Sequence, residues 1–281
     1  MSPSAPPAIV NFVPTGMLPT HEQSPHVPIS VREVVEDVHR AWEIGITIVH
    51  LHAREPKTGL PTSDPEIYAE LVTKIRRYAP ELVVCVSTSG RLNPEASVRR
   101  LVLELEGAAK PDMASLTLGS LNFNHTASIN TPQTIRELAE VMRDRAIRPE
   151  LEIFDSGMAN YAKYLIEKSV IRAPYYANLI LGNVACAQAT PLSLGWLVQE
   201  LPPETLWSAG GVGRSQLTAN LLALAAGGGV RVGLEDNLWY DNGRTRLATN
   251  EDLLRRVHRQ REELERPLMT SAEFRRLQEL T

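Results

Sequence analysis

Several features that mark particular classes of protein are scarce or absent in this sequence of 281 residues. Only two cysteines occur, Cys85 and Cys186, too few for a disulfide framework, so we expect reduced thiols in a cytoplasmic protein. No apolar run reaches the roughly 18 residues of a membrane span. The first residues, MSPSAPPAIVNF, lack the basic start and apolar core of a secretory signal. A formal net charge of −4 gives no basic surface, so we expect neither nucleic acid nor membrane as a partner.

What the sequence does contain is an alternation of strand-like and helix-like segments. Strands are predicted over 9–15, 47–53, 82–88, 113–119, 150–155, 177–183, 205–211 and 230–236. Helices are predicted over 30–45, 64–80, 94–107, 131–145, 157–170, 191–201, 214–228 and 249–266. Eight strand–helix pairs, with no linker or internal repeat, predict one (β/α)8 TIM barrel domain over 1–281, ending in a helical tail over 267–281. An open doubly wound sheet fits this length less well.

Two histidines stand at the end of the second predicted strand, in the stretch VHLHAR (49–54). Side chains alternate along a strand, so His50 and His52 point to the same side, with Cα atoms about 6–7 Å apart. The end of a barrel strand is where catalytic groups lie, and this spacing suits two ligands of one metal ion. The alternative is two histidines held in polar niches of the core. Arg54 lies beyond the two histidines, and we expect it to contact either an anionic substrate or a loop carboxylate.

A third ligand is expected from a carboxylate at another strand end, namely Asp155, Glu235 or Asp236. Glu235 shares a strand face with Arg231 and can point toward the barrel axis, although a salt bridge between these two residues is the alternative. Asp236 points the other way in an extended strand. Both acids therefore serve one site only if the strand ends between them.

Two further stretches carry polar or glycine-rich turns. In CVSTSGR (85–91), Ser87 shares a face with Cys85, and Ser89, Gly90 and Arg91 form a turn that can bind a carboxylate. Cys85 lies deeper in the strand and is a poor candidate for a fourth metal ligand. The stretch AGGVGR (209–214) opens the seventh helix, near where barrels bind phosphate, so it is a weak candidate site through Gly211, Gly213 and Arg214. Alternatively, its glycines only allow a tight turn.

Taken together, these motifs resemble the family of β-keto acid cleavage enzymes. The matching stretches follow the family's order over residues 9–241: PTGM, PHVPIS, GITIVHLHAREPKTGLP, VVCVSTSGR, PDMASLTLGSLNFN, ELEIFDSGM, LILGN, AGGVGR and GGGVRVGLEDNLWY. The resemblance implies a homotetramer of (β/α)8 barrels with a divalent metal, usually zinc, bound by His50, His52 and Glu235. It implies that a β-keto acid reacts with acetyl-CoA to give acetoacetate and a new acyl-CoA, with Asp236, tuned by Arg231, as the general base.

The resemblance also places a substrate pocket and shows one departure in it. Ser87 and Ser115 match positions of the family's substrate pocket, and we assign Thr88, Ser89 and Gly90 to the same pocket. Family members that act on the amino-substituted keto acid have a glutamate where this sequence has Leu18. A leucine cannot pair with a substrate ammonium group, so we expect a keto acid without one.

Three other classes remain to be weighed. An amidohydrolase also begins with His-x-His, but it needs further histidines at later strand ends, where this sequence has Asp155 and Asn183. A class II aldolase uses the same metal chemistry and would act without acetyl-CoA. A metal-binding protein without catalytic activity is the third alternative.

Overall fold

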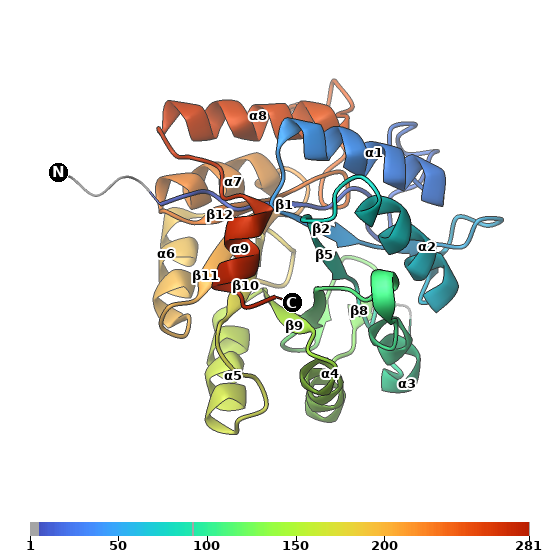
Figure 1. Ribbon diagram of the computed structural model, residues 1–281. Helices are drawn as coiled ribbons and strands as arrows, with labels where there is room; N and C mark the ends of the chain where they lie inside the picture. Colours follow the sequence, from blue (N-terminus) through green and yellow to red (C-terminus); the bar gives the residue numbers. More distant parts are fainter. Residues whose placement is uncertain (1–5, 92, 281) are drawn as a thin grey trace.

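The predicted strands pair in parallel and close on themselves. The structure of the protein is a computed structural model that describes residues 6–91 and 93–280. Its barrel follows the order β1-β12-β11-β10-β9-β6-β5-β2, which joins the first and last barrel strands (Figure 1). The eight strands of this barrel, all within the described residues, are β1 (Val10–Phe12), β2 (Ile48–Leu51), β5 (Val83–Val86), β6 (Met113–Thr117), β9 (Arg148–Ile153), β10 (Tyr176–Leu181), β11 (Leu206–Gly211) and β12 (Gly229–Val232). The predicted (β/α)8 barrel is confirmed.

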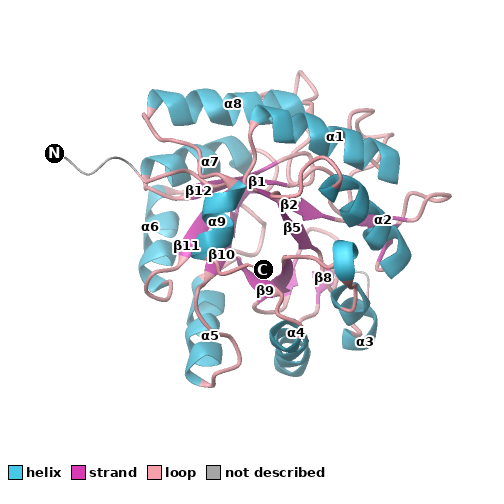
Figure 2. Cartoon of the chain, in the orientation of Figure 1, coloured by secondary structure: helices cyan, strands magenta, loops and turns pink. Residues whose placement is uncertain are grey.

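A ring of helices surrounds this barrel (Figure 2). The long ones are α1 (Val31–Ile44), α2 (Pro65–Arg76), α4 (Pro132–Asp144), α5 (Ser156–Glu167), α6 (Pro191–Glu200), α7 (Ser215–Ala225) and α8 (Asn250–Glu263). Side chains cap the starts of three of these helices: Ser30 and Glu33 form a capping box at α1, and Asp64 and Thr131 cap α2 and α4. None of the helices in the described ranges is long and apolar enough to cross a bilayer.

The prediction of one helix over 94–107 is wrong. This region holds the short helix α3 (Ala96–Arg99) and the 3-10 helices η1 (Arg100–Leu103) and η2 (Gly107–Ala109). Glu95 makes no side-chain capping bond, so the start of α3 lacks the stabilisation that α1, α2 and α4 have. Arg99 is buried, and its Nε donates to the carbonyl of Thr88 at 2.6 Å. This inward contact ties the segment to the end of β5.

Two short hairpins after barrel strands were not predicted. β3 (Ala53–Arg54) pairs with β4 (Pro61–Thr62) after β2, and β7 (Leu121–Asn122) pairs with β8 (Ala127–Ser128) after β6. Both hairpins extend the rim at the carboxyl ends of the strands. They therefore form part of the wall around any site there.

The predicted tail closes the opposite end of the barrel. Its helix α9 (Ser271–Leu277) lies across the barrel in Figure 1. The Phe274 ring is fully buried and meets the Tyr176 ring edge-on, with centroids 5.2 Å apart. Thr47 Oγ1 donates to the carbonyl of Met269 at 2.6 Å. Apolar side chains of the described residues fill this end, whereas a cavity opens at the carboxyl-terminal rim.

Candidate active site

The alternation of side chains along β2 places both histidines inside the barrel. Val49 and Leu51 pack outward into the main hydrophobic core, whereas His50 and His52 are buried on the inner side. Their ring centroids are 5.2 Å apart. The predicted orientation of this strand is confirmed.

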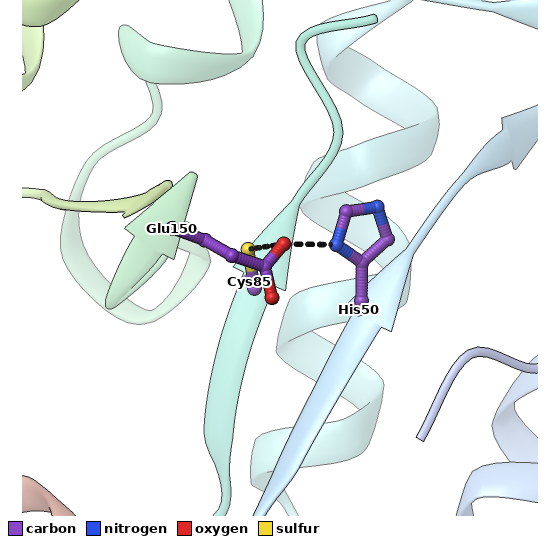
Figure 3. Close-up of side chains that lie close together, drawn as sticks. All are labelled: His50, Cys85 and Glu150. Atoms are coloured by element: carbon purple, nitrogen blue, oxygen red, sulfur yellow. Dashed lines mark hydrogen bonds and ion pairs between the residues drawn. The ribbon is translucent and has the colours of Figure 1, made fainter. Parts of the chain in front are cut away.

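His50 is held by a glutamate that the sequence reading overlooked. Its Nδ1 lies 2.6 Å from Oε2 of Glu150 on β9, and Figure 3 shows the other ring nitrogen pointing away from this contact. Burial acts to lower the pKa of His50, but the Glu150 carboxylate outweighs it and raises this pKa to about 8. The contact fixes the proton on Nδ1 and leaves Nε2 to face other groups.

The other contacts of Glu150 satisfy its second oxygen. Oε1 accepts from Asn11 Nδ2 at 2.6 Å and from Asn178 Nδ2 at 2.7 Å. Cys85 Sγ lies 3.4 Å from Oε2 (Figure 3). Burial raises the pKa of the Cys85 thiol well above its usual range, and the charge of Glu150 raises it further. A protonated thiol is a poor metal ligand, which agrees with the expectation that Cys85 is a poor candidate for a fourth ligand.

The last barrel strand ends early enough to bring both acids into one site. β12 stops at Val232, and the chain turns at Gly233, whose carbonyl accepts from Asp236 N at 3.3 Å. A Cβ on Gly233 would collide with the Val13 carbonyl, so the turn requires glycine. Gly16 has φ +68°, and a Cβ there would collide with the Glu235 side chain. The strand was expected to end between Glu235 and Asp236, but it ends before both, and the turn at Gly233 brings the two side chains together.

Arg231 joins the two acids. Its Nη2 donates to Glu235 Oε1 at 2.7 Å, and its Nε donates to Asp236 Oδ2 at 2.9 Å. Burial favours a raised pKa at both carboxyls. At Glu235 the charges of Arg231 and His52 outweigh burial and hold the pKa well below its usual range. At Asp236 burial prevails and raises the pKa, as suits a group that accepts a proton near neutral pH.

Three of these residues form a set that fits a divalent metal. His50, His52 and Glu235 each offer one ligand atom, and these atoms lie within 4.8 Å of one another. Glu235 Oε1 lies 3.2 Å from His52 Nε2, while the buried Oε2 has no hydrogen-bond partner among the described residues. A buried carboxylate oxygen without a partner costs free energy unless a ligand satisfies it. Two imidazoles and one carboxylate are a common catalytic zinc set.

A cavity of about 140 Å³ opens beside this set. Leu18, Ser87 and Ser89, three of the residues assigned to the substrate pocket, line it. Much of the remaining wall is apolar and comes from β10, from the segments that follow β1, β9 and β11, and from the β7–β8 hairpin region: Met17, Leu121, Phe123, Phe154, Ile180 and Val212. The cavity therefore joins a charged end at the ligand set to an apolar side.

The other residues assigned to the pocket lie behind this wall. Ser115 Oγ accepts from Thr88 N at 3.0 Å, and Thr88 Oγ1 donates to the Ser115 carbonyl at 2.5 Å. Both side chains are buried. Gly90 packs on Arg99, where a Cβ would lie 2.6 Å from Nη1. These three residues support the loop that carries Ser87 and Ser89.

The glycine-rich stretch forms a tight strand–helix turn near the cavity. Gly211 packs on the backbone of Ser215, and Gly213 has φ +58° and donates its N–H to the Asp236 carbonyl at 2.7 Å. Arg214 is exposed at the start of α7. The glycines therefore allow a tight turn, which was the alternative to a phosphate site. The hydrogen bond from Gly213 also connects this turn to Asp236, the candidate general base.

Two residues left open by the sequence have structural contacts. Asp155 caps α5 by accepting from Met158 N at 3.0 Å. Arg54 donates to the carbonyls of Pro19 and Gly59 at 3.0 and 3.1 Å, so it ties two rim loops together. Glu152, which was overlooked, lines the cavity and accepts from Thr117 Oγ1 at 2.6 Å.

The fold and the site define a (β/α)8 barrel with a histidine–carboxylate ligand set at its rim, and comparison identifies the family. Residues 7–280 match the family described as beta-keto acid cleavage enzyme. The chain is 36% identical over 274 residues to 3-oxoadipate:acetyl-CoA acetyltransferase of Cupriavidus necator, covering 96% of this chain and 94% of that protein. It is 34% identical over 259 residues to 3-keto-5-aminohexanoate cleavage enzyme of Fusobacterium nucleatum, covering 92% of each. The chain belongs to the β-keto acid cleavage enzyme family.

Solved structures support the fold. The apo structure of ObcA is similar with a TM-score of 0.78 and 21% identity, covering 92% of this chain and 66% of that chain. A ternary complex of ObcA with a C4-CoA adduct and oxalate gives a TM-score of 0.76 at 21% identity, covering 92% of this chain and 68% of that one. At this identity the likeness supports the barrel architecture alone.

Proposed function

We propose that this protein cleaves a β-keto acid in a reaction with acetyl-CoA, giving acetoacetate and a new acyl-CoA. The observation that carries the proposal is the pairing of a metal-ligand set with a separate buried carboxylate, Asp236, across Arg231. Relatives whose names include acetyl-CoA as a reactant support the second substrate. Membership of the β-keto acid cleavage enzyme family supports a β-keto acid as the first substrate.

Asp236 begins the proposed reaction. It takes a proton from the CH2 group between the carboxylate and the keto group of the substrate. The resulting carbanion attacks the thioester carbonyl of acetyl-CoA and expels the CoA thiolate. The thiolate then attacks the original keto carbon, and the bond between that carbon and the former CH2 carbon breaks. One fragment leaves as the new acyl-CoA, and the other takes the proton back from Asp236 as acetoacetate.

Arg231 and the ligand set prepare this step. Arg231 holds Asp236 toward the cavity and offsets the negative charge of two neighbouring carboxylates. His50, His52 and Glu235 would hold the metal, for which we propose zinc because of the donor set. When bound, such an ion acts as a Lewis acid that polarises the keto group and favours loss of the adjacent proton. Ser87 and Ser89 are proposed to bind the substrate from the facing wall.

Leu18 defines the proposed difference from relatives that act on an amino-substituted keto acid. Its side chain is exposed and lines the cavity beside Met17. An apolar group there offers no partner to an ammonium group, so a keto acid without an amine is preferred. Comparing kcat/KM for 3-keto-5-aminohexanoate and a simple alkyl β-keto acid tests this, and a clear advantage for the amino substrate would contradict it.

Three further assignments belong to the same proposal. Acetyl-CoA reaches the cavity past the Gly211–Arg214 turn, where Val212 contributes to the wall. Apolar side chains exposed near α6, namely Val184, Leu192 and Trp196, support assembly into the homotetramer. The free thiols of Cys85 and Cys186 support a cytoplasmic location. Light scattering on the purified chain tests the tetramer directly, and a monomer would contradict it.

Replacing Asp236 by asparagine tests the assignment of the base. Asp236→Asn keeps the shape of the side chain but cannot accept the substrate proton, so we expect turnover to fall about 10²- to 10⁴-fold. Elemental analysis should show the same metal content as in the wild type. Asp144→Asn is the control, because Asp144 is exposed on α4. Wild-type turnover without acetyl-CoA would contradict the proposed reaction and favour an aldolase-type lyase.

A further inference from the structure

The loop that follows β5 is held firmly on its outer side. Arg99 donates to the Thr88 carbonyl at 2.6 Å and to Asn130 Oδ1 at 2.7 Å, while Thr88 bonds to Ser115. Gly90 has no room for a side chain against Arg99. These contacts fix the backbone, and the loop then presents Arg91 to the cavity.

The Arg91 guanidinium rests on an aromatic face. Its Cζ lies 3.3 Å from the centroid of the Phe123 ring, and that ring packs edge-on against Phe154, with centroids 6.2 Å apart. Both rings line the same cavity. Stacking of this kind holds the guanidinium plane and leaves its N–H groups free to bind a planar anion at the edge.

Arg91 differs from the other cations of the cavity. Arg231 has close ion pairs with Glu235 and Asp236, and His52 faces Glu235. Arg91 forms no ion pair within residues 6–91 and 93–280, and its buried Nε has no hydrogen-bond partner there. Glu235 and Asp236 attract Arg91 only from beyond ion-pair distance. A half-buried guanidinium without a close ion-pair partner among the described residues favours an anion beside this largely apolar wall.

We propose that Arg91 binds a carboxylate at the distal end of the substrate, so that the enzyme acts on a β-keto acid with a second carboxylate. This inference rests on the proposed function and names its substrate class. The keto acid end meets the charged side with His52, Glu235 and Asp236. The carbon chain then runs along the apolar wall, and the second carboxylate reaches Arg91 beside Phe123.

An adjoining cavity of about 260 Å³ is not lined by Arg91. It shares Met17, His52, Ser87 and Ser89 with the first cavity, and its lining includes no arginine, lysine or carboxylate. Within the described residues, this second cavity therefore offers no arginine or lysine that could compete with Arg91 for a carboxylate. A CoA phosphate remains the other anion that Arg91 could bind, and the experiment separates the two sources.

The test compares two six-carbon substrates that differ at one end, 3-oxoadipate and 3-oxohexanoate, in the wild type and in Arg91→Gln. We expect the variant to lose about 10- to 100-fold in kcat/KM for the dicarboxylate, because a charge-assisted hydrogen-bonded pair is removed. The value for the monocarboxylate and the KM for acetyl-CoA should stay nearly unchanged. Arg91→Lys should recover part of the loss, and Arg32→Gln, on the exposed face of α1, should change nothing.

Two outcomes would overturn the proposal. Equal losses for both substrates would mean that Arg91 serves the carboxylate they share or the fold itself, and a raised KM for acetyl-CoA with an unchanged substrate preference would assign Arg91 to CoA. Measuring the affinity for adipate and for hexanoate by calorimetry tests the Arg91 site independently of the proposed reaction, because neither compound is a β-keto acid. A weaker affinity for adipate alone in Arg91→Gln supports the distal carboxylate site even without turnover, whereas equal adipate affinity in both proteins refutes it.

Discussion

Two polar layers lie one above the other inside this barrel, and they differ in how their groups are satisfied. In the lower layer, Glu150 accepts from Asn11 and Asn178 and contacts His50, while the Tyr176 hydroxyl donates to Ser208 at 2.9 Å. Its unpartnered side-chain atom among the described residues is a neutral amide oxygen, Asn11 Oδ1. This layer holds groups in place.

The upper layer leaves charged atoms without partners. Glu235 Oε2 and Arg231 Nη1 are buried and lack a hydrogen bond within the described part of the chain. Burying such atoms is costly unless a ligand completes their contacts. The contrast fits the proposed function, in which the lower layer positions His50 and the upper layer would bind the metal and substrate and carry out the reaction.

The largest effect is expected from removing a ligand in the upper layer. Glu235→Gln keeps the size of the side chain but replaces a carboxylate by a weakly binding amide. Metal content should fall, and turnover should drop by at least about 10²- to 10³-fold because the developing charge loses its main stabiliser. Elemental analysis and a turnover assay measure both. Full metal content with normal turnover would remove Glu235 from the ligand set.

A smaller effect is expected when the lower layer loses its charge. Glu150→Gln weakens the hold on His50 Nδ1 and turns an amide toward the donors of Asn11 and Asn178. We expect metal affinity to fall about 10- to 100-fold, with turnover restored at saturating metal. A metal titration of activity measures this. If turnover stays low when metal is saturating, Glu150 belongs with the reacting groups and the two layers are not separate in function.

The smallest effect on activity is expected at Tyr176. Tyr176→Phe removes a hydroxyl that donates to Ser208 and accepts from Asn11 Nδ2 at 3.1 Å. The free energy of unfolding should fall by about 1–3 kcal/mol because buried polar groups lose a partner. Turnover of the folded protein should not change. Denaturant unfolding together with an activity assay checks this, and a large loss of turnover at unchanged stability would argue against a purely structural layer.

The sequence was sufficient to predict the barrel and the inward side of His50 and His52, for physical reasons. Alternating strands and capped helices are local signals, so eight units could be counted and the inner side of His50 and His52 assigned. The turn at Gly233 could only be posed as a condition, because the end of β12 depends on its packing against Val13. The broken helix around Arg99 depends on a long-range contact with Thr88.

The two glutamates of β9 were missed for a related reason. ELEIF alternates charged and apolar residues, a pattern that usually marks a strand with one face in water. Inside a closed barrel the same alternation buries both carboxylates, where Glu150 orients His50 and Glu152 lines the cavity. Arg91 stood in a turn named for carboxylate binding, but its stacking on Phe123 joins two distant loops and needed the structure.

The most direct test of the proposed reaction follows the carbon of acetyl-CoA. The purified enzyme is incubated with a β-keto acid and acetyl-CoA labelled with ¹³C at the carbonyl, and the products are analysed by mass spectrometry. We expect the label in the keto carbon of acetoacetate and an unlabelled new acyl-CoA, whose formation requires acetyl-CoA. Label in the new acyl-CoA, or cleavage of the keto acid without acetyl-CoA, would contradict the reaction proposed for this site.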